Sequence, residues 1–205
     1  LPPSNEDFEK AGFCLQKQKL YELALRYYEQ ADLMNHNNAW TLRHMGTCSR
    51  LLEKHADALA YYQEADALQP GNRAVLYQIA NCLTELHEYQ EAMDHYFRLD
   101  LAEEHSLRAW RGIAWCAFKL QRWDTAQKYY DRIPDKEKTA QDWLNAGHLA
   151  LVTGATDNAA EYYRRADGMM GNHTAFREAL LDDITELESH GVTYSDLVLI
   201  ADMTL

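Results

Sequence analysis

The chain has 205 residues, a formal net charge of −12 and 47% hydrophobic residues. Because a nucleic-acid backbone or an anionic membrane surface would repel so acidic a protein, the composition argues against both as the main partner. No apolar run is long enough to span a bilayer, so we expect no membrane span. We expect a cytoplasmic location, but the chain begins LPPSNEDF without a methionine, which leaves open a removed leader peptide or further chain upstream.

The sequence repeats with a period of 34 residues, shortened to 33 at the last step. One small residue recurs in the first half of each repeat, and a second recurs in the second half. A tyrosine follows the second small residue four places later in every repeat. The three columns are Gly12, Gly46, Ala80, Ala114 and Gly147; Ala24, Ala58, Ala92, Ala126 and Ala159; and Tyr28, Tyr62, Tyr96, Tyr130 and Tyr163. Small residues let two helix backbones approach closely while a ring fills the groove beside them, so each repeat predicts a helical hairpin.

Helix starts recur with the same period. A serine, asparagine or threonine stands just before the apolar pattern of each repeat. Side-chain oxygens of these residue types accept hydrogen bonds from the otherwise unpaired amides of the first helical turn. We predict that five residues are the N-caps of the first helices: Ser4, Asn38, Asn72, Ser106 and Thr139.

Together with Pro70 at the end of the second repeat, these columns have the order of the tetratricopeptide repeat. The chain resembles five tandem copies of it, which implies an all-α fold: a right-handed α-solenoid of helix-turn-helix repeats. Pro134 comes early and Gly171 replaces the closing proline of the last repeat, so we expect different turns after repeats four and five. The expected segments are a lead-in at 1–4 and repeats at 5–38, 39–72, 73–106, 107–139 and 140–173.

The pattern changes after residue 173, and we expect residues 174–205 to form C-terminal capping helices. The first is expected as one amphipathic helix that ends at Gly191. Thr193, with Asp196 three residues later, predicts the N-cap of a short second helix. Its body, LVLIADM, is apolar on most sides, so we expect it to pack on repeat five. Pairing with another copy, or contact with sequence outside this chain, stays open.

Four cysteines could indicate a disulfide or a zinc site, but their spacing argues against both. Equivalent positions on successive helix layers lie about 8–10 Å apart, whereas a disulfide needs Cα atoms within about 7 Å. Thiolates spread along a solenoid also cannot enclose one zinc ion. We expect free thiols in the core, which weakly favours a reducing compartment. The four are 34 residues apart, one per repeat: Cys14, Cys48, Cys82 and Cys116.

No motif predicts catalysis. The chain has no phosphate-binding glycine loop and no serine in a nucleophile-elbow context. The segment HEYQE at residues 87–91 lacks the second histidine of the zinc-protease helix and falls in a predicted turn. Carboxylate pairs such as Asp182 and Asp183 are expected on solvated helix faces, whereas an acid/base dyad needs a desolvated cleft. We therefore expect no catalytic residues, no cofactor and no metal, and a protein that is not an enzyme.

In the tetratricopeptide family the first helix of each repeat lines an inner groove where peptides bind. Arginine forks bind carboxylates and aromatic rings give rigid anchors, so the groove suits a protein or peptide with acidic and aromatic or aliphatic side chains. The alternative is that the arginines pair with this chain's own carboxylates while the rings cover spaces between helices. By resemblance the binding residues are Trp40, Arg43, Arg50, Tyr77, Asn81, Arg108, Arg111 and Trp115. The same resemblance continues the inner face through Phe118, Gln141, Leu144, His148 and Leu151.

We expect a non-catalytic protein–protein interaction scaffold that binds a peptide or partner helix in its concave groove, as a monomer or a weak homo-oligomer. The lysine, asparagine and arginine clamp of chaperone-binding relatives is incomplete in every frame, so we do not expect a chaperone tail as the partner. Two alternatives stay open. The chain could be a regulatory or assembly segment of a larger protein, or a module that self-associates through its first repeat or the LVLIADM helix.

Overall fold

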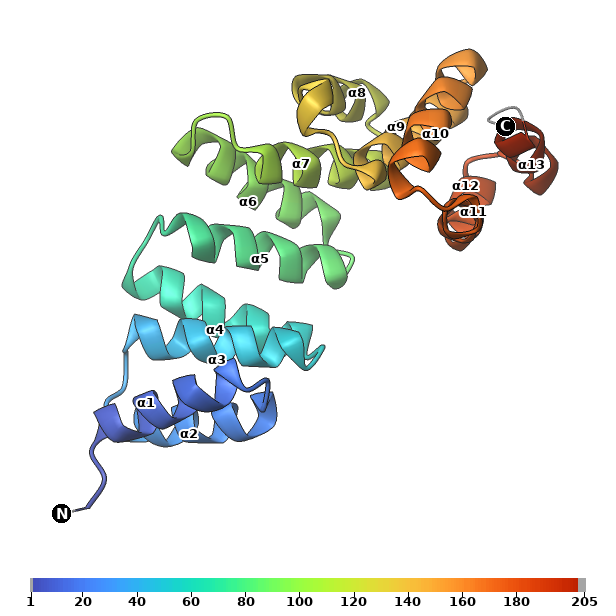
Figure 1. Cartoon of the computed structure of the whole chain (residues 1–205). Coiled ribbons are helices and arrows are strands. Elements are labelled where there is room, and N and C mark those ends of the chain that lie inside the picture. Colours follow the sequence, from blue (N-terminus) through green and yellow to red (C-terminus); the bar gives the residue numbers. More distant parts are fainter. Residues whose placement is uncertain (1, 203–205) are drawn as a thin grey trace. The chain divides into compact units, whose positions relative to one another are not determined.

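The computed structural model of the chain describes residues 2–202, and every regular element within them is a helix. The fold is therefore an all-α helical-repeat solenoid, as predicted (Figure 1). The right-handed twist of its superhelix stays a prediction. The elements are α1 (Asn5–Lys17), α2 (Tyr21–Met34), α3 (Ala39–Leu51), α4 (His55–Leu68), α5 (Arg73–Glu85), α6 (Tyr89–Ala102), α7 (Leu107–Lys119), α8 (Trp123–Arg132), the 3-10 helix η1 (Asp135–Glu137), α9 (Ala140–Val152), α10 (Thr156–Met170), α11 (His173–Asp182), α12 (Ile184–Ser189) and α13 (Tyr194–Asp202).

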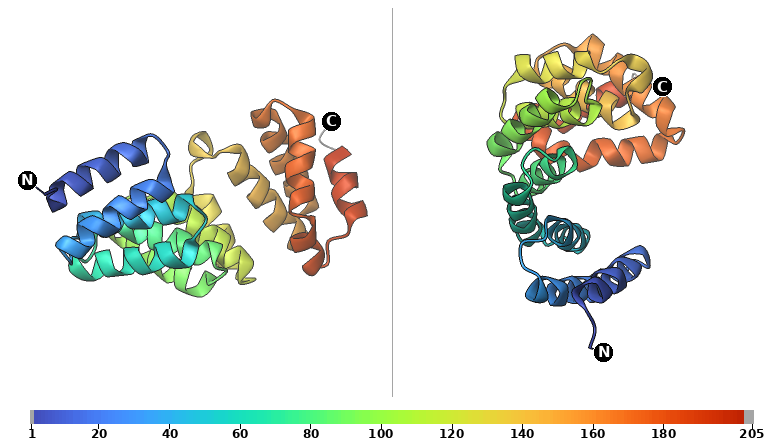
Figure 2. Two further views of the ribbon diagram at one scale, coloured as in Figure 1. Left: turned by 90° about the horizontal axis from the view of Figure 1, so that it is seen from below. Right: turned by 90° about the vertical axis from the view of Figure 1, so that its left-hand side faces the viewer.

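The residues form two compact units, Leu1–Gly112 and Ile113–Leu205, and the boundary falls inside α7. In unit 1, helix α1 packs on α2, α3 on α4 and α5 on α6, and α2 and α4 also pack on the helix that follows each of them. In unit 2, α9 packs mainly on α10. Figures 1 and 2 show the helices of each pair running antiparallel, joined by a tight turn.

The predicted N-caps are confirmed. Ser4 and Thr139 each form a capping box with an aspartate three residues later. Asn38 and Asn72 accept hydrogen bonds from amides of the first turns of α3 and α5. Ser106 Oγ accepts from the amide of Ala109 at 3.4 Å. The turn after α8 also differs as predicted, since the segment that follows Pro134 forms η1.

The small-residue and tyrosine columns are coupled. A Cβ atom built on Gly46 would lie 2.8 Å from Cε1 of Tyr62, and one on Gly147 would lie 2.4 Å from Cε1 of Tyr163. Both rings are almost fully buried. The first helix therefore approaches so closely that the ring fills the space of the missing side chain. The hydroxyl group of Tyr62 is held by the residue fifteen positions earlier, since it lies 3.0 Å from Thr47 Oγ1.

The turn between the two helices of each hairpin uses a left-handed residue, a feature that the sequence does not predict. Lys19, Glu53, His87 and Gln121 have φ between 59° and 64°, at the same period of 34 residues. This conformation strains a residue with a side chain, and glycine adopts it freely. In the fifth repeat the position is Gly154, with a φ of 79°.

The cysteines are free thiols, and three of them are buried: Cys48, Cys82 and Cys116. Burial raises the pKa of Cys48 and of Cys82 to about 11, so both thiols stay protonated at neutral pH. The prediction that Cys14 is a core residue is wrong, since it is exposed. Cys48 packs in a cluster with Ala24 of the preceding hairpin, whereas no hairpin precedes α1 in the described residues.

The C-terminal segment departs from its prediction in one respect. The expected single amphipathic helix is two helices, α11 and α12, because the chain makes a turn at Asp183. Gly191 ends the pair with a φ of 87°. As predicted, Thr193 and Asp196 cap α13, with Asp196 Oδ2 accepting from the Thr193 amide at 2.9 Å. Helix α13 packs on α10 and buries Leu197 fully, also as predicted.

Candidate functional site

The eight predicted binding residues are all half-buried on the first helices of their hairpins. Seven of them belong to unit 1, and only Trp115 belongs to unit 2. The site is therefore described on unit 1, where α3, α5 and the start of α7 carry these seven residues.

A groove of about 240 Å³ lies over α3 and α5 in unit 1. Its walls combine cationic, hydroxyl, amide and apolar groups, with little acidic character. Its lining residues are Arg43, His44, Thr47, Tyr62, Ala74, Val75 and Gln78.

Two arginines on α3 lack carboxylate partners in the described part of the chain. Arg43 Nε donates to the carbonyl of Ala39 in its own helix at 3.2 Å. Arg50, two helical turns further on, has a buried Nε atom without a hydrogen-bond partner. Across the groove, the buried Oε1 atom of Gln78 also has no partner. A buried polar atom without a partner costs stability unless something satisfies it, so both atoms would gain from a bound polar group that reaches them.

The hydroxyl groups of Thr47 and Tyr62 form the wall between these groups. Thr47 Oγ1 donates to the carbonyl of Arg43 at 2.8 Å. The Tyr62 hydroxyl therefore donates to Thr47, 3.0 Å away. Burial raises the pKa of Tyr62, while Thr47 and the nearby Arg50 guanidinium oppose the shift, so the phenol stays neutral.

An aromatic cluster stands beside the groove. The ring of Trp40 lies 4.1 Å from that of His44 and 6.3 Å from that of Phe13, measured between centroids. His44 Nδ1 lies 2.8 Å from Gln16 Oε1, which also accepts from the Tyr28 hydroxyl. Burial, and then the charges of Arg43 and Lys17, lower the pKa of His44 to about 4. The imidazole is therefore neutral at pH 7, and Arg43 is the cationic residue among those that line this groove.

The remaining predicted residues of unit 1 are engaged within the chain. Arg108 donates twice to Glu103 Oε2, at 3.0 and 2.8 Å, and its guanidinium stands 5.1 Å from the centroid of the Tyr77 ring. The alternative of pairing with the chain's own carboxylates therefore holds for Arg108. Asn81 Oδ1 accepts from the Tyr96 hydroxyl at 2.7 Å. Arg111 is half-buried on α7.

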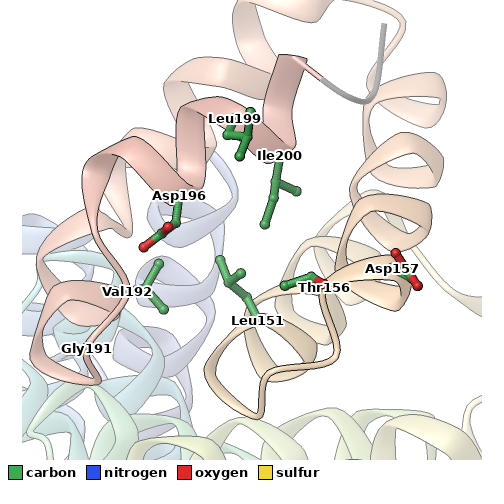
Figure 3. A pocket seen from close by; sticks show the side chains of 8 residues that line it. All are labelled: Leu151, Thr156, Asp157, Gly191, Val192, Asp196, Leu199 and Ile200. Carbon is green, nitrogen blue, oxygen red and sulfur yellow. The ribbon is translucent and has the colours of Figure 1, made fainter.

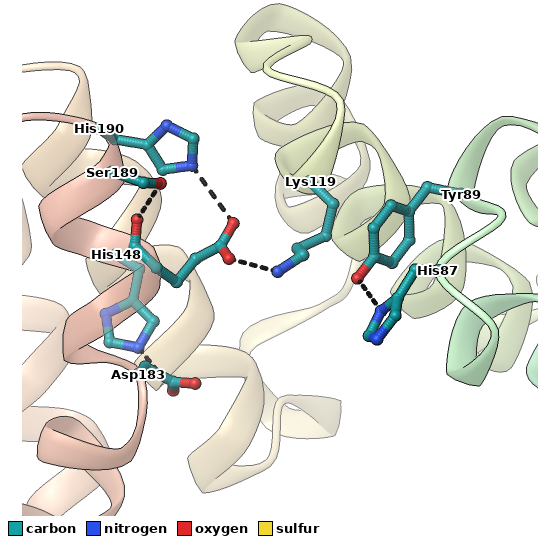
Figure 4. A network of polar contacts seen from close by, with 8 residues as sticks. His87, Tyr89, Lys119, His148, Asp183, Ser189 and His190 are labelled. Atoms are coloured by element: carbon teal, nitrogen blue, oxygen red, sulfur yellow. Dashed lines mark hydrogen bonds and ion pairs between the residues drawn. The ribbon is translucent and has the colours of Figure 1, made fainter.

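In unit 2, the prediction that the first helices line an open groove is wrong for four of the five residues named for it. Phe118, Leu144, His148 and Leu151 are buried, and only Gln141 is exposed. Their cover comes in part from the chain itself. His148 Nε2 lies 3.0 Å from Asp183 Oδ2 (Figure 4). The rings of Phe118 and His190 meet in a T-shaped contact.

The ring of Trp115, the eighth predicted residue, stacks on Phe118 with centroids 5.6 Å apart. A separate cavity of about 340 Å³ lies between the turn from α9 to α10 and helix α13, with Leu151, Val192 and Ile200 around its apolar part (Figure 3). In Figure 3 the carboxylate of Asp157 stands at the edge of this space, away from these apolar side chains.

The described residues contain no group of three or more histidines, cysteines, aspartates and glutamates placed to hold a metal ion. None of their helices is both long enough and apolar enough to cross a membrane.

Sequence reasoning missed His44 and Gln78 as lining residues. The two residues occupy the same position of their repeats, directly after the predicted inner-face residues Arg43 and Tyr77. A polar or aromatic side chain at this position could have indicated that it lines the groove. The neutral state of His44 had no signal in the sequence, because it depends on burial between two hairpins.

Two family models described as tetratricopeptide repeat match the chain, over residues 50–105 and 108–138. No curated protein matches it. Solved structures with a similar fold include YrrB, described as a TPR protein with an unusual peptide-binding site, at 18% identity and a TM-score of 0.73, covering 84% of this chain and 90% of YrrB. MamA from Desulfovibrio magneticus RS-1 is 17% identical with a TM-score of 0.74, over 81% of this chain and 94% of that one. A tetratricopeptide repeat protein from Parabacteroides merdae ATCC 43184 is 18% identical with a TM-score of 0.70, over 98% of both chains.

The fold and the groove define a helical-repeat scaffold of the kind that mediates protein–protein interaction. The chain belongs to the tetratricopeptide repeat family, whose members bind protein or peptide partners.

Proposed function

We propose that the protein is a non-catalytic scaffold that binds an acidic segment of a partner protein in the groove of unit 1 over α3 and α5. The observation that carries this proposal is the pair Arg43 and Arg50. Two arginines without carboxylate partners line one helix of a chain whose net charge is −12. In a chain with so many carboxylates, arginines left unpaired on an inner face are available for an acid from outside.

The surrounding groups favour a peptide over a lone anion. Gln78 Oε1 is an acceptor without a hydrogen-bond partner in the described residues, so it suits an amide group of a peptide backbone. The ring of Trp40 beside the groove suits an aromatic or aliphatic side chain next to the acidic one. The similar structure of YrrB is described as having an unusual peptide-binding site, which supports this class of ligand. A cytoplasmic location is part of the proposal, because buried free thiols suit a reducing compartment.

The test is a peptide array probed with the full chain and with two double variants. Arg43→Ala/Arg50→Ala removes Arg43, which lines the groove, and Arg50, which lies two turns further along α3. Arg26→Ala/Arg73→Ala is the matched control, since it removes the same charge from exposed positions on α2 and α5. We expect the wild type to select peptides with an aspartate or glutamate near an aromatic or aliphatic residue. The groove variant should bind these at least about tenfold more weakly, a loss of about 1.4 kcal/mol, while the control variant binds as the wild type does.

Selection of basic peptides, or equal binding by the groove variant and the wild type, would contradict the proposal. The alternative of self-association is separated by light scattering on the purified chain, since a self-associating module increases in mass with concentration. The alternative of a segment of a larger protein predicts that the groove binds a sequence from another part of that protein.

A further inference from the structure

The inner face of the last two hairpins in unit 2 is covered by this chain's own C-terminal segment. By position in the repeat, Phe118 and His148 correspond to residues that line a groove, yet each is only 1% exposed. The segment that covers them runs from Asp183 through α12 to His190.

The cover is made largely by polar and aromatic contacts, of which Figure 4 shows the polar ones. Lys119 Nζ, at the end of α7, donates to a carboxylate oxygen of Glu186. His190 Nε2 lies 3.3 Å from the other carboxylate oxygen of Glu186. The His190 ring stands edge-on to Phe118 and to Trp123, with centroids 5.7 and 5.3 Å away.

One helical turn earlier, the chain makes a second polar contact with the same face. Asp183 Oδ2 lies 3.0 Å from Nε2 of His148, whose Nδ1 atom is 2.8 Å from the Tyr163 hydroxyl. Asp183, Glu186 three residues later and the ring of His190 four residues after that each contact a side chain of this face. The spacing is that of one face of a helix.

Several features make this segment easy to displace. Helix α12 has six residues and is separated from α11 by the turn at Asp183. An isolated helix shorter than about 12 residues is marginal in water, so α12 depends on its contacts. Leu187 is its only buried residue, and the other five are half-buried or exposed.

We propose that residues 183–190 act as an internal ligand, covering a surface that otherwise takes an acidic helix from a partner protein. The partner chemistry follows from the contacts: two acidic residues three positions apart, a leucine after the second, and an aromatic residue or histidine one turn later. The acids face His148 and Lys119, and the ring meets Phe118 and Trp123. The partner's helix and the internal segment compete, so the free protein is partly closed to this partner. This surface belongs to unit 2 and is independent of the groove proposed for unit 1.

The probe is a fluorescent synthetic peptide with the sequence of residues 173–191, titrated with full-length variants. Glu186→Lys breaks the ion pair with Lys119 and turns it into repulsion, which should release the internal segment. We expect this variant to bind the peptide at least tenfold more tightly than the wild type. Glu188→Lys makes the same charge change at an exposed position of α12 and should behave as the wild type. Adding Lys119→Glu to Glu186→Lys restores an ion pair and should return binding to the wild-type level.

Equal peptide binding by the wild type and Glu186→Lys, or binding by neither, would overturn the proposal. Amide hydrogen exchange on the wild-type chain tests it without any substitution. We expect the amides of α12 to exchange at least tenfold faster than those of α9, because a displaceable segment opens without unfolding the hairpin below it. Exchange of α12 at the rate of α9 would show that the segment is part of the cooperative fold. Arg43→Ala/Arg50→Ala should change neither result, which separates this proposal from the unit 1 groove.

Discussion

The coupling of the small-residue and tyrosine columns can be measured by one pair of glycine substitutions in unit 2. Gly147 in α9 and Gly168 in α10 both lie inside helices, so replacement by alanine should stabilise either helix by up to about 1 kcal/mol through helix propensity. Their surroundings differ. A Cβ atom on Gly168 meets nothing within 4 Å, whereas one on Gly147 would lie 2.4 Å from Cε1 and 2.5 Å from Cδ1 of Tyr163.

The Tyr163 ring has little room to retreat. It is 0% exposed, and its hydroxyl group lies 2.8 Å from Nδ1 of His148. Adding a methyl group to such a core costs about 1–3 kcal/mol, and the close approach here places the cost near the upper limit. After the gain in helix propensity is subtracted, Gly147→Ala should lower the free energy of unfolding by about 2 kcal/mol. Gly168→Ala should raise it by about 0.5–1 kcal/mol.

The assay is urea unfolding of both variants and the wild type, followed by far-ultraviolet circular dichroism. The prediction is a lower midpoint for Gly147→Ala and a slightly higher one for Gly168→Ala, at an unchanged slope. A Gly147→Ala variant as stable as the wild type would refute the reasoning, because it would mean that the ring is not locked against α9. A destabilised Gly168→Ala would show that propensity does not set the effect at an open position.

Three further predictions concern other parts of the chain. Ala92 is the fully buried small residue of the third repeat's second helix, α6, so Ala92→Leu should lower the free energy of unfolding measured in urea by about 1–3 kcal/mol. An unchanged free energy would mean that the repeat register is wrong. His44 has a pKa of about 4 in the folded chain, below its ordinary 6.5, so its contribution to stability is full above pH 6.5 and is lost as the pH falls toward 4. Between pH 7 and pH 5 the wild type should therefore lose about 1 kcal/mol more of its free energy of unfolding than His44→Gln does, a figure discounted because the ring is partly exposed. Thermal melts at the two pH values measure the difference. Equal losses in the two proteins would show that the imidazole is not desolvated. Gln121→Gly, at a left-handed turn position, should raise the melting temperature, since glycine removes a strain of about 1 kcal/mol, and a lower melting temperature would place the φ of this residue outside that region.

The repeat architecture was readable from the sequence because it is encoded locally and then copied. The small residues, the tyrosines and the N-caps recur at one spacing, and each acts within its own hairpin. Gly46 and Tyr62, for example, meet across a single helix pair.

The errors came from contacts that no periodicity encodes. Cys14 is exposed because its column is covered by the preceding hairpin, and no hairpin precedes α1 in the described residues. The inner face in unit 2 is closed by contacts such as that between Lys119 and Glu186, which are 67 positions apart. In unit 1, Arg108 pairs with Glu103 of the same chain, whereas Arg43 and Arg50 have no carboxylate partner in the described residues. The sequence does not distinguish them, because all three are arginines on the first helices of their hairpins.

The proposed function requires that Arg43 and Arg50 receive the acidic group of a bound peptide. It is tested most directly by nuclear magnetic resonance of the arginine Nε–H and tryptophan indole signals while the tightest acidic peptide from the array is added to the full chain. We expect the Nε–H signals of Arg43 and Arg50 and the indole signal of Trp40 to shift together, with a peptide affinity that falls as the salt concentration is raised. Shifts at the exposed Arg26 or at Trp123 of unit 2, with Arg43 and Arg50 unchanged, would contradict it.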